Sequence, residues 1–257
     1  MWIHEPLNGM IGAMSDPMQS ADLRPLHIQV HDMLVSRLAR GEWAPGEPLP
    51  SELALATEYN ISVGTLRKAL DAMVAGGLIV RRRGKGTFVR SHSPDSALER
   101  FFRVVCEDGA KIFPDDEVLS QDHVRPNRRE KAFLALPTSE AVFRVHRIRR
   151  IQGIPVLTDT LAVPERLFAG FDWCSSSHIF QAPYQYYERR FGIRVIKVTE
   201  YLTGMSASRA DAKILGIEPG APLLVIERQA FTFNDVPVEL RISRVNTSKH
   251  RYMTRVI

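Results

Sequence analysis

Seven cationic side chains crowd into one short stretch of the chain, between residues 60 and 92. They are Arg67, Lys68, Arg81, Arg82, Arg83, Lys85 and Arg90, and the only acid among them is Asp71. Seven cations and one acid give this stretch a charge of +6, whereas the whole chain of 257 residues carries +5. A concentrated basic block suits a polyanion such as nucleic acid, because each neutralised phosphate releases bound counterions. The charge therefore predicts one local binding site rather than a generally basic protein.

A second group of charged residues lies near the middle of the chain. Arg147 and Arg149 are two residues apart in an alternating run typical of a β-strand, so both side chains should lie on one face. Asp159 follows after a turn at Gly153. Paired arginines on one face can hold a carboxylate or phosphate with two parallel hydrogen bonds. A salt-bridge network with Asp159 is the simpler alternative, and the spacing alone leaves both interpretations open.

Catalysis and metal binding find little support in the sequence. Asp159 and Glu239 could form an acid–base pair, but two carboxylates without a nucleophile motif or a phosphate loop are weak support for an enzyme. His27 and His31 lie one helical turn apart, a spacing that could hold zinc, but no third ligand lies near them. We therefore expect no enzyme activity, no metal site and no cofactor.

An apolar stripe predicts a first helix from about residue 25 to residue 40. The apolar residues in this stretch are Leu26, Ile28, Val30, Leu34, Val35 and Leu38. Gly41 ends the helix, and a turn-rich connector follows. A stripe of this kind should bury one face of the helix against a small domain.

Two shorter helices joined by a tight turn follow the connector. Ser51 and Ser62 are good N-caps, because a serine oxygen can accept a hydrogen bond from the free amides of a first turn. The second of these helices carries Thr65, Arg67 and Lys68. The arrangement predicts a helix-turn-helix, whose second helix enters the major groove of DNA.

A glycine-tipped hairpin is expected directly after these helices. Two β-prone runs flank Arg83, Gly84, Lys85 and Gly86, and Thr87 begins the returning strand. Glycines at the tip allow the backbone to approach a partner closely. A solvated basic hairpin is the alternative, but the preceding helix-turn-helix favours the wing of a winged helix.

The composition is that of a globular protein, with 44% hydrophobic and 25% charged residues. We expect a flexible extension over residues 1–21, a winged helix-turn-helix domain over 22–90, a polar linker over 91–97 and a second domain over 98–257. The second domain mixes alternating runs, such as residues 141–148, with helical patches, which predicts an α+β fold. These helical patches lie near residues 128–136, 183–191 and 206–215. No run approaches the ~20 apolar residues of a membrane span.

The first domain resembles the GntR family of bacterial regulators along its whole length. The resemblance rests on residues 41–46 (GEWAPG), 49–52 (LPSE), 65–70 (TLRKAL) and 84–89 (GKGTFV). It implies DNA contacts from Ser62, Thr65, Arg67 and residues 83–87, and the cap Ser51 and the neighbouring Lys68 complete the expected interface. Many relatives carry arginine where this chain has Pro48, Leu53 and Val63. We therefore expect an operator unlike the commonest family sites.

The second domain is similar to the UTRA effector-binding domain, which defines the HutC subfamily and has a chorismate-lyase-like fold with an antiparallel sheet. The similarity rests on residues 145–155 (VHRIRRIQGIP), 210–216 (ADAKILG) and 219–228 (PGAPLLVIER). It implies a small-molecule site lined by Arg100, Arg147, Arg149, Asp159, Tyr184, Glu239 and Tyr252. Relatives that bind sugar phosphates usually have Glu in place of Asp159 and Ser in place of Ala182 and Arg100. We therefore expect a small anionic effector, with a carboxylate favoured over a sugar phosphate.

Together these features predict a ligand-responsive transcriptional regulator, a repressor that binds a palindromic DNA operator as a homodimer. We expect it in the bacterial cytoplasm, associated with the nucleoid when bound to its operator, and not in a membrane. The alternative is an effector-independent DNA-binding protein whose second domain only dimerises.

Overall fold

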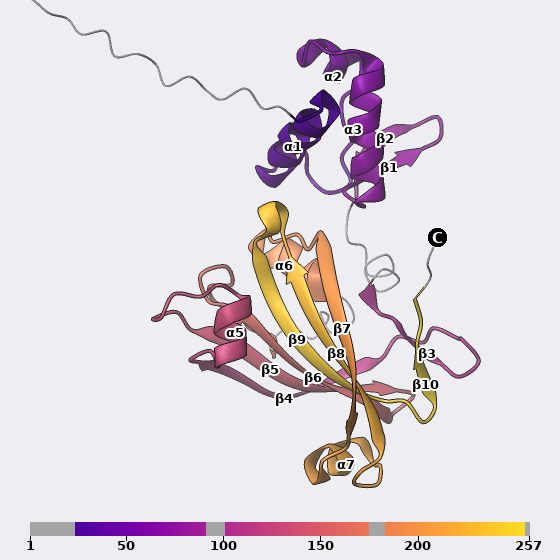
Figure 1. Ribbon diagram of the computed structural model, residues 1–257, viewed down its shortest axis with the longest axis vertical. Coiled ribbons are helices and arrows are strands. Elements are labelled where there is room, and N and C mark those ends of the chain that lie inside the picture. The colour runs from indigo at the N-terminus through magenta and orange to yellow at the C-terminus, as the bar shows by residue number, and fades with distance from the viewer. Residues whose placement is uncertain (1–23, 91–100, 175–182, 255–257) are drawn as a thin grey trace, which may run out of the picture.

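Three helices and a hairpin form the first domain in a computed structural model that describes residues 24–90, 101–174 and 183–254 (Figure 1). The helices are α1 (Leu26–Ala39), α2 (Glu52–Glu58) and α3 (Val63–Ala75), and the hairpin pairs β1 (Ile79–Arg82) with β2 (Gly86–Val89). The predicted helix-turn-helix and its following hairpin are therefore present. The expected extension at 1–21 and the linker at 91–97 lie outside the described residues.

One face of α1 is buried in the core of this domain, as the apolar stripe predicted. Val30, Leu34 and Leu38 are buried, whereas Leu26 is 50% exposed and Ile28 is 37% exposed. The expectation that Leu26 and Ile28 belong to the buried stripe is wrong. At 100° per residue Ile28 lies about 120° from Leu34 around the helix, and Leu26 lies at the margin of the buried face. Leu66, Leu70 and Met73 of α3 face the core as expected.

A six-stranded antiparallel sheet dominates the second domain, in the order β4-β5-β6-β9-β8-β7. Its strands are β4 (Asp115–Val124), β5 (Val142–Ile151), β6 (Ile154–Pro164), β7 (Lys197–Ser206), β8 (Pro222–Phe231) and β9 (Pro237–Asn246). A separate pair joins β3 (Val104–Cys106) to β10 (His250–Tyr252). The expected α+β class with an antiparallel sheet is confirmed.

Short helices border the sheet. They are α5 (Arg128–Phe133), α6 (Pro183–Phe191), α7 (Arg209–Leu215) and the 3-10 turn η1 (Phe233–Asp235). The helix expected from residue 206 begins later, because Ser206 still pairs in β7 and Ser208 caps α7. Among the described residues, no helix is both long and apolar enough to cross a bilayer.

Alternation along the strands gives the sheet two different faces. On one face Val145, Leu161 and Val163 pack with the aromatic side chains of α6. On the other face Val142 and Ala162 pack with a cluster around α5. The first face also carries Arg147, Arg149 and Asp159, because these residues have the same parity along β5 and β6.

Candidate DNA interface and effector site

Serine caps fix the start of both helices of the helix-turn-helix. The Ser51 hydroxyl accepts a hydrogen bond from the Ala54 amide at 3.1 Å. The Ser62 hydroxyl accepts from the Thr65 amide at 3.1 Å and also lies 2.9 Å from the Thr65 hydroxyl. Ser62 and Thr65 therefore form one exposed polar site at the beginning of α3, where a recognition helix meets DNA.

Glu52 on α2 forms an ion pair with Arg67, the arginine of α3. Arg67 donates from Nε and Nη2 to Glu52 Oε2, at 3.0 and 2.8 Å. Arg81 on β1 donates to the other carboxylate oxygen at 3.3 Å. The Arg67 side chain stays 59% exposed, so it remains available to a groove or a phosphate. Lys68 is exposed beside it.

The wing is anchored to the rest of the first domain. The Leu49 amide donates to the Thr87 carbonyl at 2.8 Å, which joins the connector to β2. The exposed tip turns at Gly84 and Gly86, whose φ angles of 70° and 108° disfavour residues with a Cβ atom. Arg83 and Lys85 are exposed at this tip. The expected DNA-contacting residues thus lie on α2, α3 and the wing.

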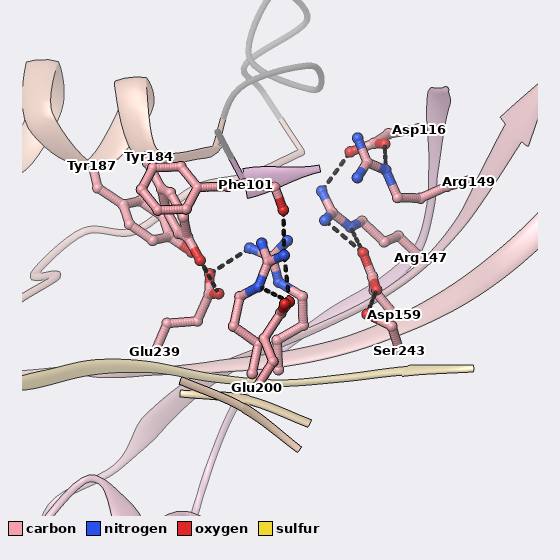
Figure 2. Close-up of polar contacts among 12 residues, drawn as sticks. Phe101, Asp116, Arg147, Arg149, Asp159, Tyr184, Tyr187, Glu200, Glu239 and Ser243 are labelled. Carbon is pink, nitrogen blue, oxygen red and sulfur yellow. Dashed lines mark hydrogen bonds and ion pairs between the residues drawn. The ribbon is translucent and has the colours of Figure 1, made fainter. Parts of the chain in front are cut away.

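A row of alternating charges crosses one face of the six-stranded sheet (Figure 2). We call it the buried charged cluster, and its members are Asp116, Arg147, Arg149, Asp159, Glu200, Arg228, Glu239 and Arg241. They come from all six strands, so no single segment contains the site. Four arginines face four acids, and the charges are balanced.

Arg147 is fully buried at the centre of one half of this cluster. It donates from Nε and Nη2 to Asp159 at 2.9 and 2.6 Å, and from Nη1 to Asp116 at 2.5 Å. Arg149 donates to the same Asp116 at 2.7 Å. Burial favours a higher pKa for Asp159, but the neighbouring guanidinium groups outweigh it and hold this pKa well below its ordinary value. Of the two interpretations left open by the sequence, the salt-bridge network is present.

Glu239 organises the other half of the cluster. It accepts hydrogen bonds from the hydroxyls of Tyr184 and Tyr187 at 3.2 and 2.6 Å, and from Arg241 at 2.7 Å. Burial and the adjacent carboxylate raise the pKa of Tyr184 to about 12. The helix α6 is therefore tied to β9 through neutral phenols on a buried anion.

Arg228 connects the cluster to the beginning of the second domain. It donates to Glu200 at 2.8 Å and also to the backbone carbonyl of Phe101. The Phe101 ring packs edge-on against Tyr184, with centroids 4.8 Å apart. Tyr252 reaches the same region, because its hydroxyl donates to Glu200. Four of the expected effector residues thus belong to the cluster, Tyr184 contacts it, and Tyr252 lies at its margin, while Arg100 lies outside the described residues.

Three buried donor groups in or beside the buried charged cluster have no hydrogen-bond partner among the described residues. They are Arg149 Nη2, Arg241 Nε and Trp173 Nε1. Buried donors are normally satisfied, because leaving one unpaired costs about 1–3 kcal/mol. The guanidinium of Arg147 lies 5.2 Å from the centre of the Trp173 ring, which places Trp173 beside the cluster.

Several members of the cluster were not identified from the sequence. Period-two alternation from Glu239 could have indicated Arg241, and also Ser243 beside the cluster, because both share its strand face. Ser243 donates to Asp159. No sequence signal indicates Asp116, because its place opposite Arg149 depends on long-range strand register and a nearby bulge.

A surface hollow of about 760 Å³ lies elsewhere, along α1 of the first domain. Its charged residues pair with one another, as in the contacts of Arg37 with Glu42 and Glu58. None of the expected effector residues lines this hollow.

Two family models match successive parts of the chain. Residues 26–89 match the family model described as "Bacterial regulatory proteins, gntR family", and residues 112–251 match the UTRA domain. A Shigella flexneri protein named "Probable fructoselysine utilization operon transcriptional repressor" is 32% identical, over 84% of this chain and 88% of its own length. The Histidine utilization repressor of Pseudomonas putida is 26% identical, over 88% of this chain and 90% of its own.

A solved structure shares the fold of the second domain. The ligand-binding domain of a GntR-family regulator from Bordetella bronchiseptica superposes with a TM-score of 0.58 at 26% identity, and the match covers 62% of this chain and 98% of that one. These relatives are regulators of transcription and not enzymes. The chain therefore belongs to the GntR family of bacterial transcriptional regulators, in the HutC-like group that joins a winged helix-turn-helix to a UTRA domain.

Proposed function

We propose that this regulator is a homodimeric repressor that binds a palindromic operator and responds to a small anionic metabolite. The observation that carries the proposal is the combination of an exposed basic winged helix with a separate buried cluster that has three unpaired donors. In such a protein the ligand changes operator affinity by favouring one arrangement of the domains. The repressor acts in the bacterial cytoplasm and associates with the nucleoid when it holds its operator.

The proposed DNA interface consists of the caps, the recognition helix and the wing. Its residues are Ser51, Ser62, Thr65, Arg67, Lys68, Arg83, Gly84, Lys85, Gly86 and Thr87. Two copies would place their recognition helices in successive major grooves, about 34 Å apart. Because Leu53 and Val63 stand where many relatives carry arginine, base reading relies more on Arg67 and the wing.

The homodimer is supported by an unpaired edge of the sheet. β7 is the last strand in the sheet order and pairs with β8 alone among the described strands. Tyr201, Leu202 and Met205 expose large apolar side chains along it. A closed dimer needs one self-complementary patch, and an antiparallel edge supplies one.

The proposed effector site contains Arg147, Arg149, Asp159, Tyr184 and Glu239, with Tyr252 at its margin and Arg100 outside the described residues. Because the arginines are already balanced by acids, the unpaired donors rather than net charge support a ligand rich in acceptor oxygens. A carboxylate fits better than a phosphate, since it adds less negative charge to a balanced site. Fructoselysine and histidine, the compounds in the names of two relatives, each carry a carboxylate.

The decisive experiment begins with selection of bound duplexes from a random DNA library by the full chain. Affinity for the selected duplex is then measured with and without a panel of carboxylates, their amides and sugar phosphates. We expect one carboxylate to change affinity between about 5- and 150-fold, and its amide to act more weakly. If no compound alters affinity, the alternative of an effector-independent DNA-binding protein is favoured.

A further inference from the structure

The two domains touch at a contact built around a single buried arginine. Arg194 follows α6 in the second domain and is 7% exposed. Its Nη2 donates to the backbone carbonyl of Leu78 at 3.1 Å and also to the carbonyl of Arg90. Both acceptors belong to the first domain, so this guanidinium crosses the boundary between the domains.

The two carbonyls lie at the base of the wing. Leu78 directly precedes β1 and Arg90 directly follows β2. The Arg90 amide donates to the Leu78 carbonyl at 2.9 Å, which closes the hairpin at this point. Arg194 therefore binds the place where both strands of the wing leave the first domain, and it can set the angle at which the wing projects.

Apolar contacts surround this polar contact. Ile196, two residues beyond Arg194, packs against the core of the first domain. Phe233, in the turn between β8 and β9, packs against the same core. Figure 1 shows this end of the sheet, with α6 and the β8–β9 turn, next to the first domain. Arg194 is thus embedded in an interface rather than resting on a surface.

The other end of the connection is the buried charged cluster. Tyr184 and Tyr187 on α6 both donate to Glu239, as Figure 2 shows. At the end of the same helix, Glu188 lies 3.5 Å from Arg194 Nε. The Ile193 amide donates to the Tyr187 carbonyl at 3.0 Å, so the segment carrying Arg194 is fixed to the helix. One helix of nine residues therefore links Glu239 to the wing.

We infer that Arg194 is a positioning residue that transmits the state of the effector site through α6 to the wing. The inference rests on the proposed function, and it adds the route by which a ligand at Glu239 changes DNA binding. A ligand that alters the contacts of Tyr184 or Tyr187 shifts α6. Arg194 then carries that shift to the carbonyls of Leu78 and Arg90.

A double-mutant cycle tests this route without any ligand. Glu239→Gln, Arg194→Gln and the double variant are made in the full chain, and affinity is measured for a duplex that the wild type selects from a random library. We expect Glu239→Gln to change affinity, and this change to shrink at least about fivefold when Arg194 is absent. Hydrogen exchange of the Arg90 amide should follow the same pattern.

Independent effects of the two substitutions would overturn the inference about Arg194. If Arg194 only stabilises the fold, both substitutions act independently and their effects on affinity multiply within a factor of about two. The same conclusion follows if Glu239→Gln leaves affinity and exchange unchanged. Should Glu239→Gln fail to fold, Tyr187→Phe replaces it, since it removes one hydrogen bond to the same carboxylate.

Arg190→Gln is the matched control. Arg190 lies near the end of α6, is exposed, and loses the same charge on substitution. It should show no coupling to Glu239→Gln. Because the cycle uses no metabolite, its failure is distinguishable from failure of the proposed effector response, which is measured separately by the compound panel.

Discussion

At the scale of single residues, carboxylate side chains hold the arginines of both proposed sites in place. In the first domain Glu52 bonds to Arg67 and Arg81 together, but the pair with Arg67 is largely exposed. Exposed pairs contribute about 0–1 kcal/mol, so DNA can compete for Arg67 easily. In the second domain Arg147 and its acids are buried, and a ligand must fit around an existing network.

Arg67→Ala tests the proposed recognition helix. If Arg67 reads a base edge, the substitution should weaken binding of the selected duplex by about 1–3 kcal/mol and relax specificity at one position. Fluorescence anisotropy with selected and scrambled duplexes measures both effects. An equal loss on scrambled DNA would identify a phosphate contact instead, and Arg40→Ala, an exposed cation beyond α1, serves as the control.

Tyr184 predicts an alkaline limit on stability. Its pKa is about 12 in the folded protein against 10.0 ordinarily, so the folded state disfavours the phenolate. This stabilisation is complete below pH 10, is lost as the pH rises toward 12, and amounts to about 3 kcal/mol, since each tenfold change in the protonation equilibrium is worth about 1.4 kcal/mol. Urea unfolding of wild type and Tyr184→Phe between pH 9 and about 11.5 should show a shallower decline in the variant. If stability declined equally with pH in both proteins, a raised pKa of Tyr184 would be contradicted.

At the scale of elements, the two edges of the sheet differ in a way that matters for assembly. β4 and β7 are the outer strands, and both expose a large apolar residue. β7 exposes three such residues, whereas β4 exposes only Leu119 among the described residues. A long exposed apolar edge favours pairing with another strand, because its backbone groups are unpaired. β7 is therefore the edge on which we place the dimer.

Leu202→Lys tests the proposed dimer edge, because it replaces an exposed apolar side chain of β7 with a charged one. We expect a shift toward monomer in analytical ultracentrifugation, and a larger loss of affinity for a palindromic duplex than for a duplex of equal length that carries a single half-site. Leu119→Lys on β4 is a matched control, since Leu119 and Leu202 are each 48% exposed. Dissociation by the Leu119 variant alone would move the interface to the opposite edge.

At the scale of the whole molecule, the two domains have separate cores that meet at a small contact. One core comprises buried residues between Val30 and Val89, and the others lie in the second domain. Ile196 and Phe233 reach from the second domain to the first core. Such an arrangement lets one domain change its stability or position without unfolding the other.

Arg147→Ala tests whether the two domains can lose stability separately. The substitution leaves Asp116 and Asp159 buried without their principal cation, which should cost about 3–5 kcal/mol in the second domain. Hydrogen exchange resolved by peptide should show faster exchange in the sheet, while α1 to α3 keep their protection and the protein still binds DNA. Equal loss of protection in both domains would mean that they unfold as one unit.

The sequence by itself determined the features that depend on neighbouring residues. Ser51 and Ser62 cap their helices, the glycines turn the wing, and alternation places Arg147 and Arg149 on one face, because each depends on local backbone geometry. With the family resemblance, these features also indicated the fold of both domains. The identity of the buried side of α1 was only partly predictable, since Leu26 and Ile28 are as apolar as their buried neighbours.

Only the tertiary structure decided which distant residues meet. Asp116, Glu200 and Arg228 join the cluster through the order and register of strands far apart in the chain, and no local pattern encodes that register. The contact of Arg194 with the base of the wing likewise joins residues more than 100 positions apart. The charges that make up the sites could be read from the sequence, but the pairs they form depend on how the sheet and the two domains pack.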